Sequence, residues 1–314
     1  MKHIFIVNPC AGTGDMTDFI KKQLKELNLN IDYEVYRTTE KGGATRYIKE
    51  ILSKNTGEYR FYSCGGDGTL NEVVNGAVGY SNASVTVLPY GSGNDFIKYY
   101  GKAEDFLNIK ELTQAKNHKI DVLKACGRYA VNAVHFGFDT AVLKTMEKVR
   151  RKFLLGGKNA YTTGVVTALI NGMKTACTVK ADGNKIGKEK MLLCTLSNGK
   201  YVGGSYKCAP NSLNDDGLME VCLVNTLSRL TLLRFISKYK EGTHLENKSM
   251  QKYINYTKAK TVEIEGGKGF CLSLDGELVF TEKCTVELVS GALNFAVPQK
   301  LCNSVSENKE RQVI

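Results

Sequence analysis

The run from Cys64 to Gly76, CGGDGTLNEVVNG, constrains the fold more than any other stretch of this chain. The residues before it, 59–63, are rich in aromatic side chains and predict a short buried strand. After it, apolar residues recur at helical spacing from Thr69 to Val78, which predicts a helix. The glycines therefore fall in the turn between a strand and a helix. Glycine in such a turn lets the backbone adopt positive φ and approach a ligand closely.

This turn is suited to hold a phosphate group. The free N–H groups at the start of the helix would face the turn and favour an anion. Asp67 sits among these donors, where a carboxylate alone would compete with the anion. A Mg²⁺ ion would remove the conflict, because it takes oxygen ligands and bridges carboxylates to phosphates. The pattern is neither a Walker A loop nor a GxGxxG fingerprint, so by itself it is also compatible with a plain strand-to-helix turn.

Two further predicted strands end in loops of small residues. The loop NPCAGTG at 8–14 follows a predicted strand at 4–7, and the loop PYGSGNDF at 89–96 follows a predicted strand at 84–88. The carboxyl ends of parallel strands meet at one edge of a sheet, so we expect these loops and the Gly65 loop to converge there. Together they predict phosphoryl transfer from a nucleotide.

With these motifs in place, the chain resembles the catalytic domain of the diacylglycerol kinase and sphingosine kinase family. It is most similar to the soluble bacterial diacylglycerol kinases and related lipid kinases. The resemblance rests on GGDGT with NE at 65–72 and on PxGxGNDF at 89–96, and it continues in register from Asn8 to Glu277. The GGDGT motif alone also resembles NAD kinases and phosphofructokinases, and the second motif distinguishes the chain from them.

The sequence pattern and the resemblance together predict two domains. Residues 1–125 alternate strands and helices, which indicates a Rossmann-like parallel-sheet α/β domain, with NAD-kinase-like topology implied by the resemblance. Residues 126–290 are dominated by short β-rich stretches and predict a β-sandwich domain for the lipid substrate. Residues at about 291–300 are expected to return to the first domain. The polar tail 303–314 is expected to be disordered.

Helices are expected to interrupt the second domain at 140–149, 159–173 and 227–240. In the first domain, the apolar face of the first helix is expected to consist of Met16, Phe19, Ile20, Leu24 and Leu27.

Composition limits the class of protein. With 314 residues, 42% of them hydrophobic, the chain can bury two cores. No apolar run approaches the roughly 20 residues of a membrane span, and the first residues enter a strand without a signal peptide. The 10 cysteines are scattered without a CxxC pair, which fits free thiols in a reducing cytosol. We therefore expect a cytoplasmic protein.

The net charge of +11 suggests attraction to anionic phospholipid headgroups and peripheral association with a membrane. The segment 148–155, KVRRKFLL, is the best candidate for this contact, and the alternative is a helix that buries its apolar residues in the core. Nothing in the sequence is typical of a nucleic-acid-binding module, so no nucleic-acid partner is expected. A homodimer is left open.

The resemblance also assigns nucleotide-binding positions. They are Asn8, Pro9, Gly12, Thr39, Gly65, Gly66, Asp67, Gly68, Thr69, Asn71, Gly91, Ser92, Asn94 and Asp95. For some of them a structural role is the alternative: Thr38 or Thr39 would supply a helix N-cap, and Asn94 or Asp95 would cap a helix beginning at Phe96.

Three acidic residues are the candidate catalytic groups. By the resemblance, Glu277 accepts the proton of the lipid hydroxyl, and a carboxylate is able to do so as a general base. Asp67 is the rival base, and it is otherwise expected to reach Mg²⁺ through water in a network with Asp121. Without the resemblance, Asp275-Gly276-Glu277 would be read as a hairpin turn with an exposed acid.

A second metal site is implied at 210–218. There the resemblance assigns a structural Mg²⁺ to the carboxylate of Asp216 and the carbonyl oxygens of Leu213 and Leu218. The residue types alone indicate only a turn, because Asp-Asp-Gly is a common sequence in turns.

The lipid is expected to enter between the domains, where Asn132, Gly137 and Asp139 match a family pattern. His135 would assist there or serve as a packed structural residue. The resulting prediction is an ATP- and Mg²⁺-dependent lipid kinase that converts diacylglycerol to phosphatidic acid. The alternatives are phosphatidylglycerol or a sphingoid base as acceptor, an NAD kinase, and a non-catalytic nucleotide- or lipid-binding regulator.

Overall fold

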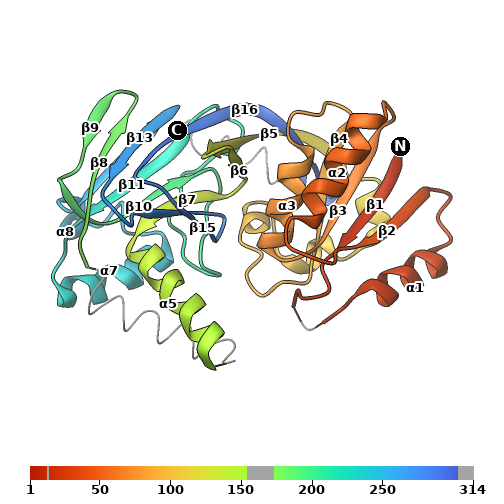
Figure 1. Cartoon of the computed structure of the whole chain (residues 1–314), viewed down its shortest axis with the longest axis horizontal. Coiled ribbons are helices and arrows are strands. Elements are labelled where there is room, and N and C mark those ends of the chain that lie inside the picture. Colours follow the sequence, from red (N-terminus) through yellow and green to blue (C-terminus); the bar gives the residue numbers. More distant parts are fainter. Residues whose placement is uncertain (13, 154–172, 303–314) are drawn as a thin grey trace.

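The structure is a computed structural model that describes residues 1–12, 14–153 and 173–302. Two domains lie side by side and are joined through the long strands β5 and β16 (Figure 1). The tail at 303–314 lies outside the described residues, as does the helix expected at 159–173 except for its last residue. The side chains of the basic segment 148–155 also lie outside them.

The first domain alternates strands and helices. Its elements are β1 (Lys2–Val7), α1 (Thr17–Leu27), β2 (Asp32–Arg37), α2 (Gly43–Lys54), β3 (Tyr59–Gly65), α3 (Asp67–Ala77), β4 (Ala83–Pro89), the 3₁₀ turns η1 (Phe96–Tyr99) and η2 (Ala103–Phe106), α4 (Ile109–Thr113) and β5 (Lys116–Ala125).

The first four strands form a parallel sheet in the order β2-β1-β3-β4. The strands end level with one another: Val7 pairs with Cys64, and Gly65 pairs with Pro89. β4 is buried along its whole length, including its polar residues Ser84 and Thr86, as is typical of an inner parallel strand. This level edge brings the loops after β1, β3 and β4 to the same place.

Helix α1 differs from the expectation in which residues it buries. Ile20 and Leu24 are buried, whereas Phe19 and Leu27 are 46% and 39% exposed. Helix α1 packs beside β2, which is the edge strand of the sheet. An edge strand covers only a narrow stripe of the helix, so the side chains on either side of that stripe stay exposed.

The second domain is built mainly of strands. Its elements are β6 (Arg128–Ala130), β7 (Ala133–Gly137), α5 (Phe138–Phe153), β8 (Thr175–Ala181), β9 (Asn184–Ile186), β10 (Lys190–Ser197), β11 (Met219–Asn225), α7 (Arg229–Glu241), α8 (Lys248–Gln251), β12 (Ile254–Ala259), β13 (Thr261–Gly266), β14 (Cys271–Leu274), β15 (Glu277–Phe280) and β16 (Lys283–Val297), with η3 (Gln299–Leu301) after them.

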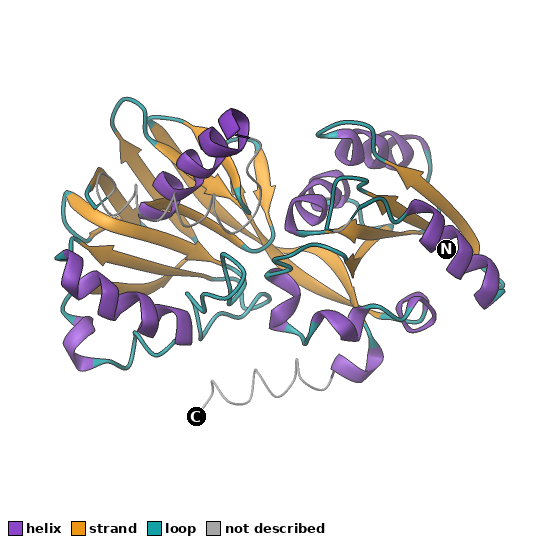
Figure 2. Ribbon diagram, turned by 90° about the horizontal axis from the view of Figure 1, so that it is seen from below, coloured by secondary structure: helices purple, strands orange, loops and turns teal. Residues whose placement is uncertain are grey.

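These strands form two sheets that face each other across an apolar core. One sheet runs β9-β8-β13-β16-β5-β6, and the other runs β12-β11-β10-β7-β14-β15. Phe136, Val221, Leu272 and Val286 belong to the core between them. Helices α5 and α7 pack on the outer face of the second sheet, where Leu193, Cys222 and Phe235 join one cluster (Figure 2). The predicted fold class, a parallel α/β domain followed by a β-sandwich, is confirmed.

Strand β16 belongs to both domains. Its first half pairs with β13 in the sandwich, and its second half pairs in parallel with β4 at Asn294 and Phe295. It pairs with β5 along most of its length, with an irregularity between Val289 and Leu293. The two strands therefore fix the first sheet against the sandwich.

Candidate active site

The three glycine-containing loops meet at the carboxyl edge of the first sheet. The N–H groups of Tyr90 and Gly91 both donate to the carbonyl oxygen of Gly65, at 2.9 and 3.1 Å. A Cβ atom at Gly91 would lie 2.3 Å from the Cα of Gly66, and one at Gly12 would lie 1.8 Å from the carbonyl oxygen of Tyr90. Such distances leave room for no side chain, so the close approach of the loops requires glycine at these positions.

Asp67 is the first residue of α3 and projects into this group of loops. Its Oδ1 accepts a hydrogen bond from the N–H of Asp95 at 2.7 Å. Burial, together with the nearby Asp95 carboxylate, raises the pKa of Asp67 to about 6. The protein thus holds a carboxylate where its negative charge is unfavourable, which is typical of a site that receives a positive charge.

Asp95 links the loop after β4 to the second domain. Its carboxylate pairs with the Lys98 ammonium at 2.7 Å and accepts the N–H of Gly204 at 2.9 Å. Asn94 has a φ of 50° and donates its side-chain amide to the carbonyl oxygen of Gly91 at 2.7 Å. Neither side chain caps the following segment, which is the short 3₁₀ turn η1. The helix-capping alternative for these two residues is therefore wrong.

Asp275 joins the two domains through hydrogen bonds, a role that the sequence analysis did not assign to it. Its carboxylate accepts four hydrogen bonds: from the side-chain amide of Asn71 at 2.9 Å, and from the N–H groups of Val131, Asn132 and Ala133 at 2.8, 3.0 and 2.9 Å. Burial raises the pKa of the Asp275 carboxyl, and these donors oppose the rise. The only local sign of this role is the Asp-Gly turn, in which Asp275 has a φ of 48°.

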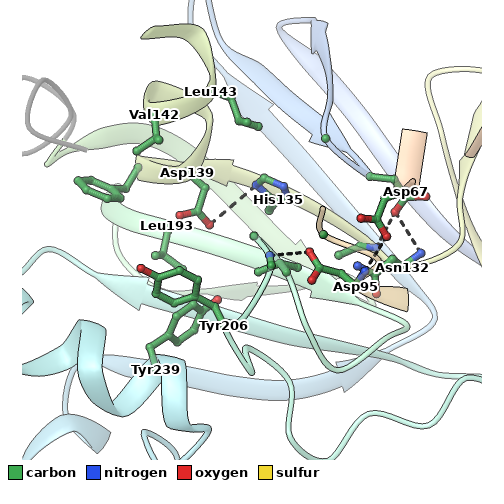
Figure 3. A pocket seen from close by; sticks show the side chains of 18 of the residues that line it. Asp67, Asp95, Asn132, His135, Asp139, Val142, Leu143, Leu193, Tyr206 and Tyr239 are labelled. Carbon is green, nitrogen blue, oxygen red and sulfur yellow. Dashed lines mark hydrogen bonds and ion pairs between the residues drawn. The ribbon is translucent and has the colours of Figure 1, made fainter. Parts of the chain in front are cut away.

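A cavity of about 510 Å³ extends from these acids into the second domain (Figure 3). Its polar end is lined by Asp67, Asp95 and Asp275, together with Ser92 and Gly93 of the loop after β4. Its apolar end lies between the outer face of β10 and the helices α5 and α7. That end is lined by Phe138, Val142, Leu143, Met146, Leu193, Leu232, Phe235, Ile236 and Tyr239.

His135 and Asp139 lie between the two ends of the cavity (Figure 3). His135 Nδ1 faces Asp139 Oδ2 at 3.8 Å, and both atoms are buried. Burial lowers the pKa of His135, so its neutral form is favoured, and burial raises the pKa of Asp139. The ring therefore presents a polar group at the point where the acid-lined end meets the apolar end.

The residues predicted to contact the nucleotide fall into two groups. One group surrounds the loops: the side-chain amide of Asn8 donates to the Thr69 hydroxyl at 3.0 Å, and Ser92 is exposed and lines the cavity. The other group has protein partners instead: Asn71 donates to Asp275 and also to the carbonyl oxygen of Tyr129 at 2.9 Å.

The role of Thr39 as a helix cap is also wrong. Thr39 is exposed, and the N-cap of α2 is Gly42 without a side-chain cap. The start of α2 is instead bound by the Glu72 carboxylate, which accepts the N–H groups of Gly42 and Ala44 at 2.9 and 3.3 Å. Thr38 is buried and donates its hydroxyl to the carbonyl oxygen of Val7 at 3.3 Å.

Glu277, the expected proton acceptor, lies at the start of β15 beside the cavity. Its neighbours Asp275 and Gly276 line the cavity, but Glu277 is not among the lining residues. Its carboxylate pairs with the Lys41 ammonium of the first domain and lies 3.9 Å from the Arg128 guanidinium. Glu277 thus forms an ion pair between the two domains.

The partners of Asp121 lie in the turn before β11 and in β16. Its carboxylate accepts the N–H groups of Gly217 and Gly291, both at 2.8 Å, and the Ser290 hydroxyl at 3.0 Å. It is 1% exposed and does not line the cavity. The structure therefore gives Asp121 a different role from the expected network with Asp67: it holds the turn before β11 against the irregularity in β16.

The turn at Asp216 does not fit a bound cation. One carboxylate oxygen of Asp216 accepts the N–H of Leu218 at 3.1 Å, and the other pairs with the Lys258 ammonium at 2.9 Å. The same ammonium lies 3.3 Å from the buried Glu220. A lysine thus already supplies the positive charge that a metal ion held by Leu213, Asp216 and Leu218 would supply.

The residues around Asp67 do fit Mg²⁺, in the way this ion binds with phosphates. Within the described ranges there is no group of three or more His, Cys, Asp or Glu side chains close enough to hold a metal ion alone. Mg²⁺ usually binds through one or two carboxylates, water and the oxygens of a phosphate. Asp95 and Asp275 are occupied by their own partners, so Asp67 is the acid best able to take this part.

The second domain contributes the remaining matches to the family pattern. Asn132 donates its backbone N–H to Asp275 and its side-chain amide to the carbonyl oxygen of Tyr201 at 2.8 Å. Gly137 has a φ of 100° at the junction of β7 and α5, and a Cβ there would lie 2.5 Å from the Leu192 carbonyl oxygen. Asn132 lines the cavity, and Gly137 is followed directly by Phe138, which also lines it.

Comparisons with known proteins agree with this architecture. Residues 2–125 match the family described as the diacylglycerol kinase catalytic domain, and residues 132–297 match the YegS C-terminal NAD kinase β-sandwich-like domain. A probable YegS-like lipid kinase of Shewanella frigidimarina is 29% identical over 282 residues, which cover 88% of this chain and 87% of that protein. The diacylglycerol kinase of Bacillus subtilis is 29% identical over 281 residues, with 87% and 88% covered.

Solved structures give the same result. A diacylglycerol kinase structure from Bacillus anthracis superposes with a TM-score of 0.70 at 25% identity and covers 96% of this chain and 98% of its own. An NAD kinase from Archaeoglobus fulgidus superposes with a TM-score of 0.51 at 11% identity, covering 99% of each chain, and this similarity concerns the fold alone. Among the described helices, none combines the length and the apolar character needed to span a bilayer.

Proposed function

Because the chain belongs to the family of diacylglycerol kinases and YegS-like lipid kinases, we propose that it transfers the γ-phosphate of ATP, with Mg²⁺, to a lipid hydroxyl. We propose diacylglycerol as the acceptor, so that the product is phosphatidic acid. The reaction forms a bond between the lipid oxygen and the phosphorus, breaks the bond between the β- and γ-phosphates, and releases a proton.

The observation that carries this proposal is the continuous cavity. One end is lined by the loop after β4 and by three acids, and the other end is lined by apolar side chains of α5 and α7. A lipid with acyl chains in the apolar end would place its polar group beside Asp67. The volume of about 510 Å³ lies in the range of pockets that bind small ligands.

We assign the nucleotide to the three loops, with Asn8, Pro9 and Gly12 on one side and Gly91 on the other. Free backbone N–H groups at the start of α3 favour the phosphates. When bound, Mg²⁺ would neutralise charge on the phosphates, and Asp67 is the residue that would hold it. Phosphoryl transfer has a loose transition state, so positioning and charge neutralisation contribute more than removal of the proton.

Two acids are candidates to accept the proton, Asp67 and Glu277. Glu277, which the resemblance implies, is engaged by Lys41 and Arg128. We therefore expect Asp67→Ala to lower activity more than Glu277→Gln. An assay that ranks the two variants in the opposite order would refute this assignment of roles.

The protein is proposed to act in the cytoplasm at the membrane surface, where its substrate resides. The net charge of +11 supports attraction to anionic headgroups.

The test is transfer of radiolabel from [γ-³²P]ATP to defined acceptors, with Mg²⁺ or with EDTA. Dioleoylglycerol, phosphatidylglycerol, sphingosine and NAD are supplied separately, and the product is identified by mass. We expect labelled phosphatidic acid only with Mg²⁺. Label in NADP, or in none of the products, would contradict the proposal.

A further inference from the structure

Helix α7 has two apolar faces, and among the described residues only its inner face packs against the rest of the protein. Its inner face carries Leu232, Phe235 and Tyr239, which are buried and line the cavity. Its outer face carries Leu230 and Leu233, which are 76% and 59% exposed. A helix on the surface of a globular domain normally presents polar residues on its outer face.

The exposed leucines are unusual within this molecule as well. Leu230, Phe280 and Leu233 are the three most exposed large hydrophobic side chains of the described residues. Phe280, at 65% exposure, lies beneath the ammonium of Lys144, which belongs to α5. An exposed apolar side chain therefore occurs at each of the two helices that line the apolar end of the cavity: Leu230 on α7, and Phe280 beside Lys144 of α5.

The outer face of α7 is also basic. Arg229, Arg234 and Lys240 are exposed there, and the helix contains no acidic residue before Glu241. Leucines interspersed with arginines and lysines match an anionic bilayer surface, where apolar side chains enter the acyl boundary and cations contact the headgroups. The cations on this face would have no counter-charge on a purely apolar partner protein. A second copy of this chain, with its net charge of +11, would repel them.

We propose that the outer face of α7, centred on Leu230 and Leu233 and flanked by Arg229 and Arg234, docks on anionic phospholipid bilayers. The opposite face of the same helix lines the apolar end of the cavity, so docking would place a membrane lipid next to the chamber that receives it. This inference rests on the proposed function for the identity of the lipid substrate, but not for the docking itself.

The docking test measures sedimentation with vesicles of phosphatidylcholine that contain 30 mol% phosphatidylglycerol and 2 mol% dioleoylglycerol. The double variant Leu230→Gln/Leu233→Gln is expected to bind at least 10-fold more weakly than the unaltered protein. The double variant Arg229→Gln/Arg234→Gln is expected to bind these vesicles at least 10-fold more weakly, while its weak binding to pure phosphatidylcholine stays within 2-fold. The matched control is Phe19→Gln/Leu27→Gln, which removes exposed apolar side chains of α1 in the other domain and is expected to bind within 2-fold.

The activity test compares two presentations of the acceptor. On vesicles, the leucine variant is expected to lose at least 10-fold in rate, and on dispersed dioctanoylglycerol its rate is expected to stay within 2-fold of the unaltered protein. If either α7 double variant binds vesicles as tightly as the unaltered protein, the docking surface is refuted. If the unaltered protein phosphorylates neither acceptor but the leucine variant loses vesicle binding, the proposed kinase activity fails and the docking surface stands.

Discussion

Replacing Asp67 with asparagine is expected to stabilise the protein while it removes activity. Burial and the Asp95 carboxylate raise the pKa of Asp67 from its ordinary value of 3.8 to about 6. A rise of this size corresponds to roughly 3 kcal/mol of unfavourable free energy for the ionised group in the folded state. Asparagine is close in shape, keeps an oxygen to accept the N–H of Asp95, and carries no charge.

The sign of the pH dependence follows from the direction of this pKa change. The folded state binds the proton more tightly than the unfolded chain, so the cost is absent below the unfolded pKa of 3.8 and complete above the folded value of about 6. Asp67→Asn should therefore raise the free energy of unfolding by about 2–3 kcal/mol at pH 8, and by less than about 1 kcal/mol near pH 4.

The assay is urea unfolding without nucleotide and with EDTA, followed by far-ultraviolet circular dichroism because the chain contains no tryptophan. Asp32→Asn, at an exposed position at the start of β2, is the matched control and should show no such gain. In parallel, Asp67→Asn should lose lipid phosphorylation at pH 8. A variant that is less stable than the unaltered protein at pH 8, or a stability difference that does not change with pH, would refute the electrostatic reasoning.

Three further substitutions test other contacts. Gly91→Ala places a Cβ 2.3 Å from the neighbouring loop, so we expect kcat/KM for ATP to fall about 100-fold, whereas Gly68→Ala meets no atom within 4 Å and should keep the unfolding midpoint or raise it. Equal stability and equal ATP kinetics in Gly91→Ala would contradict the tight loop contact. In Asp275→Asn, the side-chain NH₂ group would face buried backbone N–H donors that the carboxylate now accepts. The free energy of unfolding should therefore fall by about 3–5 kcal/mol. The control Asp182→Asn lies in an exposed Asp-Gly turn and should lower the free energy of unfolding by less than about 1 kcal/mol. Lys258→Met leaves Asp216 and Glu220 without their cation and should lower the free energy of unfolding by about 3 kcal/mol. Millimolar Mg²⁺ should restore part of this loss. An unchanged free energy of unfolding would show that the lysine does not replace a metal.

The convergence of the loops could be predicted from the sequence because it depends on local patterns. Each loop follows a short predicted strand and precedes a helix or turn, and parallel strands end at the same edge of a sheet. The structure places Gly65 within hydrogen-bond distance of Tyr90 and Gly91, as that reasoning requires. Asp67 at the first position of α3 could be predicted on the same grounds.

The partners of the other acids could not be predicted in this way. Asp275 binds Asn71, which lies 204 residues away in the chain, and Asp121 binds Gly291, which lies 170 residues away. Carboxylates in Asp-Gly turns have the same local sequence whether they bind a metal, a backbone or solvent. Lys258 beside Asp216 is a further case, since the lysine lies on a neighbouring strand and not in the turn itself.

The sequence by itself determined the two-domain class, the order of strands and helices, and the loops that require glycine. These features follow from backbone conformation and from apolar periodicity, which act over a few neighbouring residues. Only the tertiary structure decided which acids line the cavity, which are paired with a cation or with backbone N–H groups, and which face of α7 lines the cavity. Burial and hydrogen-bond partners depend on segments that are distant in the chain, so the function of a carboxylate is set by packing and not by its local motif.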